Sequence, residues 1–220
     1  MQIRALAIVS VLAAAAGMAS AQVHVEAGDA SALGGGQQTG SGSLNAIRGV
    51  LDGGLDVDMY QIRVNNWAEF SATTTLNGEL PAPVETDSQL FLFDAMGMAI
   101  AMNDDAPAPY TGFLSTLEAG SPIYSGRTAG EVVWIAVSGY DTDPRAAGAL
   151  DIFADTPFRS LARPATGPGA AGALDSWAGE NSAPRGSYRI VLTGASAVPT
   201  PGAVALLGMG GLVAGRRRRN

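Results

Sequence analysis

Short runs in which apolar and polar residues alternate restrict the fold of this sequence more than any other feature. Tyr60–Val64, Phe70–Thr74 and Ser187–Thr193 each show a period of two, which is typical of half-buried strands. No long amphipathic helix pattern occurs between Gln22 and Ala197. The alternation therefore predicts a sheet-rich domain.

Two further runs, Gln89–Phe93 and Val132–Val137, are apolar on both faces. Their β-branched and aromatic residues favour central strands over a helix, with Trp134 in the core. We expect an all-β fold over residues 44–197, an antiparallel and jelly-roll-like β-sandwich. Turn sequences separate the runs at Leu51–Gly54, Asn77–Gly78, Asp94–Gly97, Asn103–Asp105 and Gly139–Asp141.

Two segments lack the alternating pattern. Residues 22–43 include the Gly/Ser-rich stretch Ser31–Ser43, which predicts a flexible linker, with order beginning near Leu44. Residues 155–186 contain several prolines and glycines, which predict a long, loosely ordered surface excursion. Trp177 is the residue there that argues for local packing.

The amino-acid composition excludes several kinds of chemistry. The chain has 220 residues with no cysteine, no lysine and one histidine, His24, so it has no disulfide, no Cys/His zinc site and no Walker-A lysine. Its formal net charge is −7 although four of its 13 basic residues close the chain. The strongly acidic domain that remains should repel nucleic acid.

The N-terminus has the three parts of a secretion signal in the correct order. Arg4 supplies a positive charge, Ala5–Ala16 form an apolar run broken by one serine, and Ala19 and Ala21 give the small-x-small pattern of a cleavage site. We expect residues 1–21 to form a signal helix that signal peptidase removes, so that the mature protein works outside the cytoplasm.

The C-terminus carries a second targeting pattern. The apolar run Ala203–Gly215 is shorter than the ~20 residues that cross a bilayer as a helix. We expect a short hydrophobic helix that holds the chain transiently in the inner membrane, with the arginines on the cytoplasmic side. The residues of this pattern are Pro199, Thr200, Pro201, Arg216, Arg217, Arg218 and Arg219.

Residues 198–220 resemble the PEP-CTERM sorting signals of bacterial exported proteins. The matching parts are Val198–Pro201, the Gly-rich apolar run, and the terminal arginine cluster. Thr200 stands where the name-giving motif has glutamate. The resemblance implies processing by an exosortase-like enzyme, followed by display on the cell surface or release.

The order of motifs between Asp56 and Pro144 resembles the bacterial pre-peptidase C-terminal (PPC-like) domain. The pieces that carry the likeness are Asp56–Val64, Phe70–Thr74, Asp87–Asp94 with Gly97, Asn103–Asp105 and Val133–Pro144. The resemblance implies a small accessory β-sandwich without catalytic activity, some members of which bind calcium or extracellular polymers. No catalytic domain precedes the matching region in this chain.

Acidic residues and one asparagine concentrate at the predicted turns. Carboxylate and amide oxygens of several turns that meet at one end of a sandwich would suit calcium. Alternatively, Asp and Asn occur in turns because their side chains cap nearby backbone amides. The candidate metal ligands are Asp56, Asp58, Asp94, Asn103, Asp104, Asp105, Asp141 and Asp143.

These patterns together predict an exported, non-catalytic module of the cell surface or extracellular matrix that requires no cofactor. The alternative is a calcium-dependent module that binds an extracellular polymer such as a surface polysaccharide, with Tyr140 and Trp177 as candidate stacking residues. A paired-carboxylate hydrolase is a second alternative, because 20 acidic residues offer many pairs. The string Gly167–Gly172 matches a dinucleotide motif but follows no predicted strand.

Overall fold

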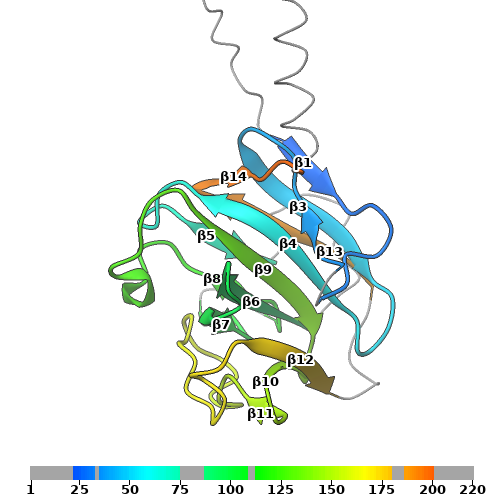
Figure 1. The fold of residues 1–220 in the computed structure, drawn as a ribbon, viewed down its shortest axis with the longest axis vertical. Coiled ribbons are helices and arrows are strands. Elements are labelled where there is room, and N and C mark those ends of the chain that lie inside the picture. Colours follow the sequence, from blue (N-terminus) through cyan, green and yellow to red (C-terminus); the bar gives the residue numbers. More distant parts are fainter. Residues whose placement is uncertain (1–21, 33–34, 75–86, 109–111, 180–185, 201–220) are drawn as a thin grey trace, which may run out of the picture.

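The computed structural model describes residues 22–32, 35–74, 87–108, 112–179 and 186–200 (Figure 1). Strands dominate these ranges, which confirms the all-β prediction; their only helical element is the 3₁₀ turn η1 (Pro122–Tyr124). The strands are β1 (Gln22–Val25), β2 (Gln37–Gln38), β3 (Leu44–Leu51), β4 (Val57–Val64), β5 (Ser71–Thr73), β6 (Ser88–Asp94), β7 (Ala99–Asn103), β8 (Thr116–Leu117), β9 (Glu131–Gly139), β10 (Thr142–Ala146), β11 (Leu150–Asp151), β12 (Leu174–Gly179), β13 (Gly186–Thr193) and β14 (Ala195–Ala197).

Several predicted segments lie outside the described residues. Within the described ranges, no helix is long and apolar enough to cross a membrane. Pro199 and Thr200 follow β14 and are described. Outside the description are the signal peptide with Ala19 and Ala21, the Asn77–Gly78 turn, and the tail from Pro201 through Arg216, Arg217, Arg218 and Arg219.

The largest sheet has six strands. Five of them follow the order β14-β4-β9-β6-β7, and the sixth, β2, also pairs with β4. The apolar runs Gln89–Phe93 and Val132–Val137 form β6 and β9 at its centre, as predicted. β9 pairs antiparallel with β4 on one side and with β6 on the other. A central strand buries both faces, which explains why these two runs are apolar throughout.

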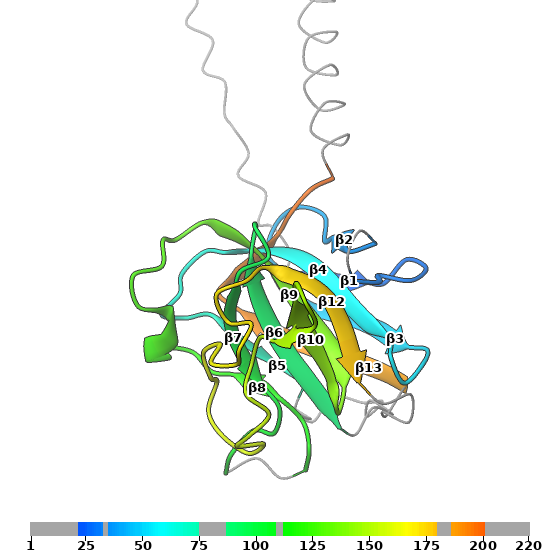
Figure 2. The same cartoon turned by 60° about the horizontal axis from the view of Figure 1, so that its bottom comes forward.

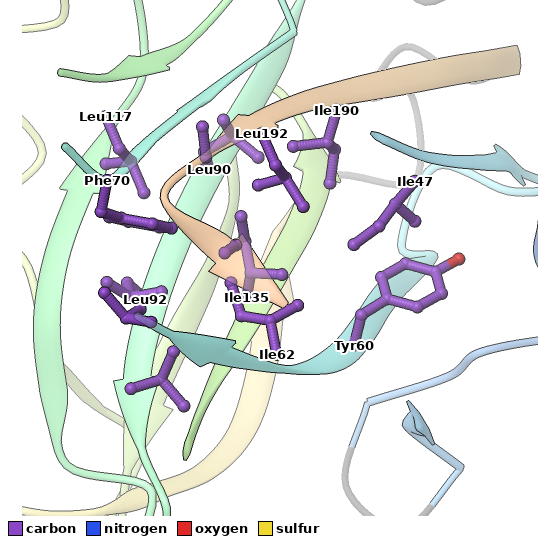
Figure 3. Close-up of a cluster of buried hydrophobic side chains, with 14 of the residues drawn as sticks. Ile47, Tyr60, Ile62, Phe70, Leu90, Leu92, Leu117, Ile135, Ile190 and Leu192 are labelled. Carbon is purple, nitrogen blue, oxygen red and sulfur yellow. The ribbon is translucent and has the colours of Figure 1, made fainter. Parts of the chain in front are cut away.

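One face of this sheet shares a core with the five-stranded sheet β1-β3-β13-β5-β8. Ile62 and Leu90 come from the six-stranded sheet, Ile47 and Ile190 come from the five-stranded sheet, and all four are fully buried in one cluster (Figure 3). The alternating pattern of the flanking strands follows from this packing, because every second side chain enters the shared core.

The other face packs against the small sheet β11-β10-β12 and the chain that surrounds it. Figure 2 shows β10 and β12 in front of β6 and β9. Phe91 and Phe93 point to this side and pack against Phe153 and Trp177, with ring centroids 5.3 to 6.4 Å apart. Trp134, predicted in the core, is only half-buried against the same cluster.

The expectation of a flexible linker over residues 22–43 is wrong for the described residues 22–32 and 35–43. β1 pairs with β3 and β2 pairs with β4, both in parallel, so the sheets are mixed rather than purely antiparallel. Ala30 is fully buried, and the Thr39 hydroxyl donates to the carbonyl of Gln61 over 2.8 Å. Backbone pairing to strand edges needs no apolar pattern, so the Gly/Ser-rich composition gave no indication of it.

The expectation of a loosely ordered excursion over residues 155–186 is also wrong where the segment is described. β12 lies within it and pairs with β10, and backbone bridges connect Arg163 to Met102 and Arg159 to Asp105. A Cβ atom on Gly167 would overlap the carbonyl oxygen of Asp151. Glycine at this position therefore permits a close approach of two backbones rather than disorder.

Candidate functional site

Three groups of carboxylates stand out among the described residues. In each group, one oxygen from each of three side chains lies within 4.8 Å of the other two. Each group combines residues that the sequence singled out with residues that it did not. The groups are Glu26, Asp29 and Asp58; Asp87, Asp104 and Asp105; and Asp141, Asp143 and Asp155.

The second group, which we call the β6–β7 cluster (Asp87, Asp104 and Asp105), forms where two neighbouring strands begin and end. Asp87 directly precedes β6, and Asp104 and Asp105 directly follow β7. Because β6 and β7 are antiparallel, with Leu90 opposite Asn103, the start of one strand meets the end of the other. One oxygen of Asp105 also contacts the Arg159 guanidinium at 3.3 Å.

Burial dominates the electrostatics of the β6–β7 cluster. Asp104 is 2% exposed, and this desolvation, together with the charges of Asp105 and Asp87, raises its pKa to about 7. Burial and then Asp105 raise the pKa of Asp87 to about 6. Burial also raises the pKa of Asp105, against the opposing effect of Arg159. Burial and mutual repulsion therefore disfavour the state in which all three carboxylates are ionised.

The third group lines a polar pocket of about 270 Å³ beside the β6–β7 cluster. Burial raises the pKa of Asp143, which accepts a hydrogen bond from the Gln89 amide at 3.2 Å. The charge of Asp143 in turn contributes to the raised pKa of Asp104, so the two groups lie within electrostatic reach. Arg145 and Asp151, which form an ion pair, also line the pocket.

The first group lies against the N-terminal segment. Asp58 on β4 is fully buried and accepts a hydrogen bond from the Tyr188 hydroxyl at 2.7 Å, and that hydroxyl also lies 2.5 Å from the Tyr60 hydroxyl. Burial, and then the nearby Glu26 charge, raise the pKa of Asp58. Both Glu26 oxygens accept backbone hydrogen bonds, from Ala30 and Val50.

Three of the predicted ligands make structural hydrogen bonds instead. One Asp94 oxygen accepts the backbone N–H groups of Met96 and Met98, and Asp56 accepts that of Asp52. The Asn103 side chain accepts from the Thr116 N–H and donates to the Ser160 carbonyl. The contacts of Asp94 and Asp56 are the turn-capping alternative that the sequence left open, whereas those of Asn103 connect β7 to residues distant in the sequence.

The two aromatic residues predicted for ligand stacking have different environments. Tyr140 is 39% exposed, and its ring lies 6.1 Å from that of Phe158, which is exposed to the same extent. Trp177 instead packs edge-on against Phe91 and Phe93. Tyr140 therefore stays available for a ligand, with Phe158 as a partner that the sequence did not indicate.

No protein-family model, curated protein or solved structure matches this chain. The functional interpretation of the carboxylate groups therefore depends on the chain's own residues and their geometry.

Proposed function

We propose that this chain is an exported, non-catalytic module of the cell surface or extracellular matrix, a jelly-roll-like β-sandwich between two targeting segments. Support for the sandwich comes from the core that the five-stranded and six-stranded sheets share. The edge pairings of β1 and β2 make it a mixed rather than a purely antiparallel sandwich.

The observation that carries the proposal is how closely the sheets adjoin the two predicted targeting segments. β1 starts at Gln22, the first residue after the predicted cleavage site, and its residue Gln22 pairs with Leu44. At the other end, the Val198 N–H donates to Thr39, and Val198 accepts from the Gly40 N–H. Val198 is the first residue of the predicted sorting motif. Both predicted targeting segments thus adjoin the sheets of the described domain.

Cell fractionation of the full chain tests this proposal. We expect neutralisation of Arg216–Arg219 by alanine to shift the protein out of the inner-membrane fraction, because the positive charges hold the short helix in place. Replacement of the four residues by lysine is the matched control, since it keeps the charge. An unchanged distribution of the alanine variant, or a mature N-terminus other than Gln22 by mass spectrometry, would contradict the proposal.

A second candidate function, a calcium-dependent module that binds an extracellular polymer, is favoured by a specific observation. The exposed Tyr140 and Phe158 rings adjoin the β6–β7 cluster, because the Tyr140 N–H donates to the Asp87 carbonyl and the Asp105 N–H donates to the Phe158 carbonyl. The charge of Asp143, which lines the pocket, also acts on Asp104. The charges of Asp141 and Asp104 both act on the Tyr140 hydroxyl, which places the ring near both carboxylate groups. Calcium can bridge protein carboxylates and polymer hydroxyls, while aromatic rings stack on sugars.

Sedimentation with insoluble polysaccharides, with calcium and then with chelator, tests the second candidate. We expect calcium-dependent binding that Tyr140→Ala weakens and that Met96→Ala, a change at another exposed apolar side chain, leaves unchanged. Binding that is equal with calcium and with chelator would contradict it. Shortening of the polymer would instead support the paired-carboxylate hydrolase, with Asp141, Asp143 and Asp155 as the candidate pair members.

A further inference from the structure

The β6–β7 cluster has the spacing of a shared cation site. Calcium binds oxygen ligands at about 2.3 to 2.6 Å, so two oxygens bound to the same ion lie at most about 5 Å apart. One oxygen each from Asp87, Asp104 and Asp105 meets this limit, with every pair within 4.8 Å. A single ion can therefore contact all three carboxylates without a rearrangement of the strands.

Hydrogen bonding in the cluster supplies a second and independent observation. Asp104 is only 2% exposed, and its Oδ1 atom has no hydrogen-bond partner in the described structure. The Oδ1 atom of Asp105, a residue only 7% exposed, likewise has no partner within the described ranges. A buried carboxylate oxygen without a donor is costly. In the first group, backbone N–H groups occupy both oxygens of Glu26, whereas the Oδ1 atom of Asp58 also has no partner among the described residues.

The positive charges near the cluster do not reach these two atoms. Arg159 contacts the other oxygen of Asp105 and also donates to the carbonyls of Ala106 and Gly112. Of the charges that shift the pKa of Asp104, that of Arg163 has the smallest effect. The Arg163 guanidinium donates instead to the Ala154 carbonyl. Among the described residues, the guanidinium of Arg159 contacts only the other oxygen of Asp105, and the Oδ1 atoms of Asp104 and Asp105 are left without a donor.

We propose that Asp87, Asp104 and Asp105 bind one hard divalent cation, calcium, at the junction of β6 and β7. This inference rests on the calcium-dependent function proposed above and assigns the ion to particular residues. The donor set consists only of carboxylate oxygens, which suit calcium rather than a soft metal. Water molecules complete the six to eight oxygens that calcium takes.

The cation has a structural consequence for the adjoining segment. Backbone hydrogen bonds of 3.1 Å connect Asp105 to Phe158 and Ser160, and Arg163 and Met102 exchange backbone bonds of 2.8 and 2.9 Å. Neutralising the repulsion between Asp104 and Asp105 stabilises the end of β7, and this end holds residues 158–163 in place. Bound calcium thus stabilises the contact between residues 158–163 and the six-stranded sheet.

Calorimetric titration and thermal unfolding of the full chain test the site, with CaCl₂, MgCl₂ and chelator at pH 7.5. We expect calcium to raise the melting temperature of the wild-type chain, because an ion that binds only the folded state stabilises it. Asp104→Asn should weaken calcium binding about tenfold or more, since charge count sets affinity in such sites. Asp175→Asn, at an exposed acid of β12 outside the three carboxylate groups, is the matched control.

Asp104→Asn stays informative even if the substitution affects folding. With chelator, this variant should melt at or above the wild-type temperature, because it removes a buried and repelled charge. Asp87→Asn, at a half-buried position, provides a second variant that should lose the calcium-induced shift.

Two results would overturn the assignment in distinguishable ways. If calcium neither binds to nor stabilises the wild-type chain, both the site and the calcium-dependent function fail. If the shift persists in Asp104→Asn and Asp87→Asn but disappears in Asp58→Asn or Asp143→Asn, the function stands and this site is wrong. Equal responses to magnesium and calcium would overturn the choice of calcium as the ion.

Discussion

The two faces of the six-stranded sheet have different compositions and carry different properties. One face buries aliphatic side chains such as Leu90, Leu92 and Ile135 against the five-stranded sheet. The other buries Phe91 and Phe93 under the small β11-β10-β12 sheet and adjoins the carboxylates. The same strands thus provide a hydrophobic core on one side and a platform for polar chemistry on the other. The first face maintains the fold, and the second is where we place the function.

The largest effect should come from the aliphatic face. Leu92→Ala removes a fully buried side chain from the shared core, and we expect it to lower the free energy of unfolding by about 3 kcal/mol. Urea denaturation measures the loss, and calcium affinity measured on the folded variant should not change. A loss below about 1 kcal/mol would show that the two sheets do not share a close-packed core.

The aromatic face should contribute less. Trp177 is half-buried, so we expect Trp177→Ala to lower the free energy of unfolding by about 2 kcal/mol, below the usual range for a fully buried tryptophan. It should also increase proteolysis within residues 155–179, because β12 loses its contacts with Phe91 and Phe93. If neither measurement changed, Trp177 would not hold this segment in place, and the loosely ordered excursion that the sequence predicted would be the better description. Trp177→Phe, which keeps a ring, is the control.

The difference between the faces also separates what the sequence could predict from what it could not. Alternation in Tyr60–Val64 and the uniform apolarity of Gln89–Phe93 are local consequences of burial, and both strands were predicted correctly. β1 and β2 are bound through backbone groups at the edges of other strands. Every residue has those groups, so no side-chain pattern predicts the pairing.

The candidate site shows the same limit. Asp94 and Asp104 both lie next to strand ends with turn-forming neighbours, so local sequence treats them alike. What distinguishes them is whether backbone N–H groups reach the carboxylate, as they do for Asp94. Asp87 joins Asp104 only because β6 and β7 are antiparallel. The position of Asp87 directly before an apolar strand was the one available indication.

The pH dependence of stability should distinguish the β6–β7 cluster from ordinary surface acids. Burial raises the folded-state pKa of Asp104 to about 7 and that of Asp87 to about 6, above the unfolded value of 3.8. The folded state therefore binds protons more tightly, and stability must rise as pH falls from about 8 to about 5. The groups that act on Asp104 are Asp105, Asp87, Asp143 and Arg163.

With chelator, we expect a gain of about 1 kcal/mol or more over this interval, since each pKa unit corresponds to about 1.4 kcal/mol. Saturating calcium should reduce or reverse the gain, because the ion binds the deprotonated carboxylates. Thermal unfolding at each pH measures both curves. The gain should be smaller in Asp104→Asn. Curves that are parallel with and without calcium would contradict this account of the cluster.

The smallest effect should come from a predicted ligand that caps a turn instead. Asp94→Ala removes the acceptor for two backbone N–H groups in the β6–β7 turn, and we expect a loss of about 0.5 to 1 kcal/mol in urea denaturation. Asp94→Asn keeps an acceptor oxygen and should lose less. Neither variant should change calcium affinity, because Asp94 belongs to none of the three carboxylate groups. If Asp94→Asn instead abolished calcium binding while Asp104→Asn retained it, the roles of these two strand-end acids would be reversed. In that case a carboxylate that accepts backbone N–H groups would bind calcium and one without such donors would not. Hydrogen bonding would then not distinguish turn-capping acids from metal ligands in this protein.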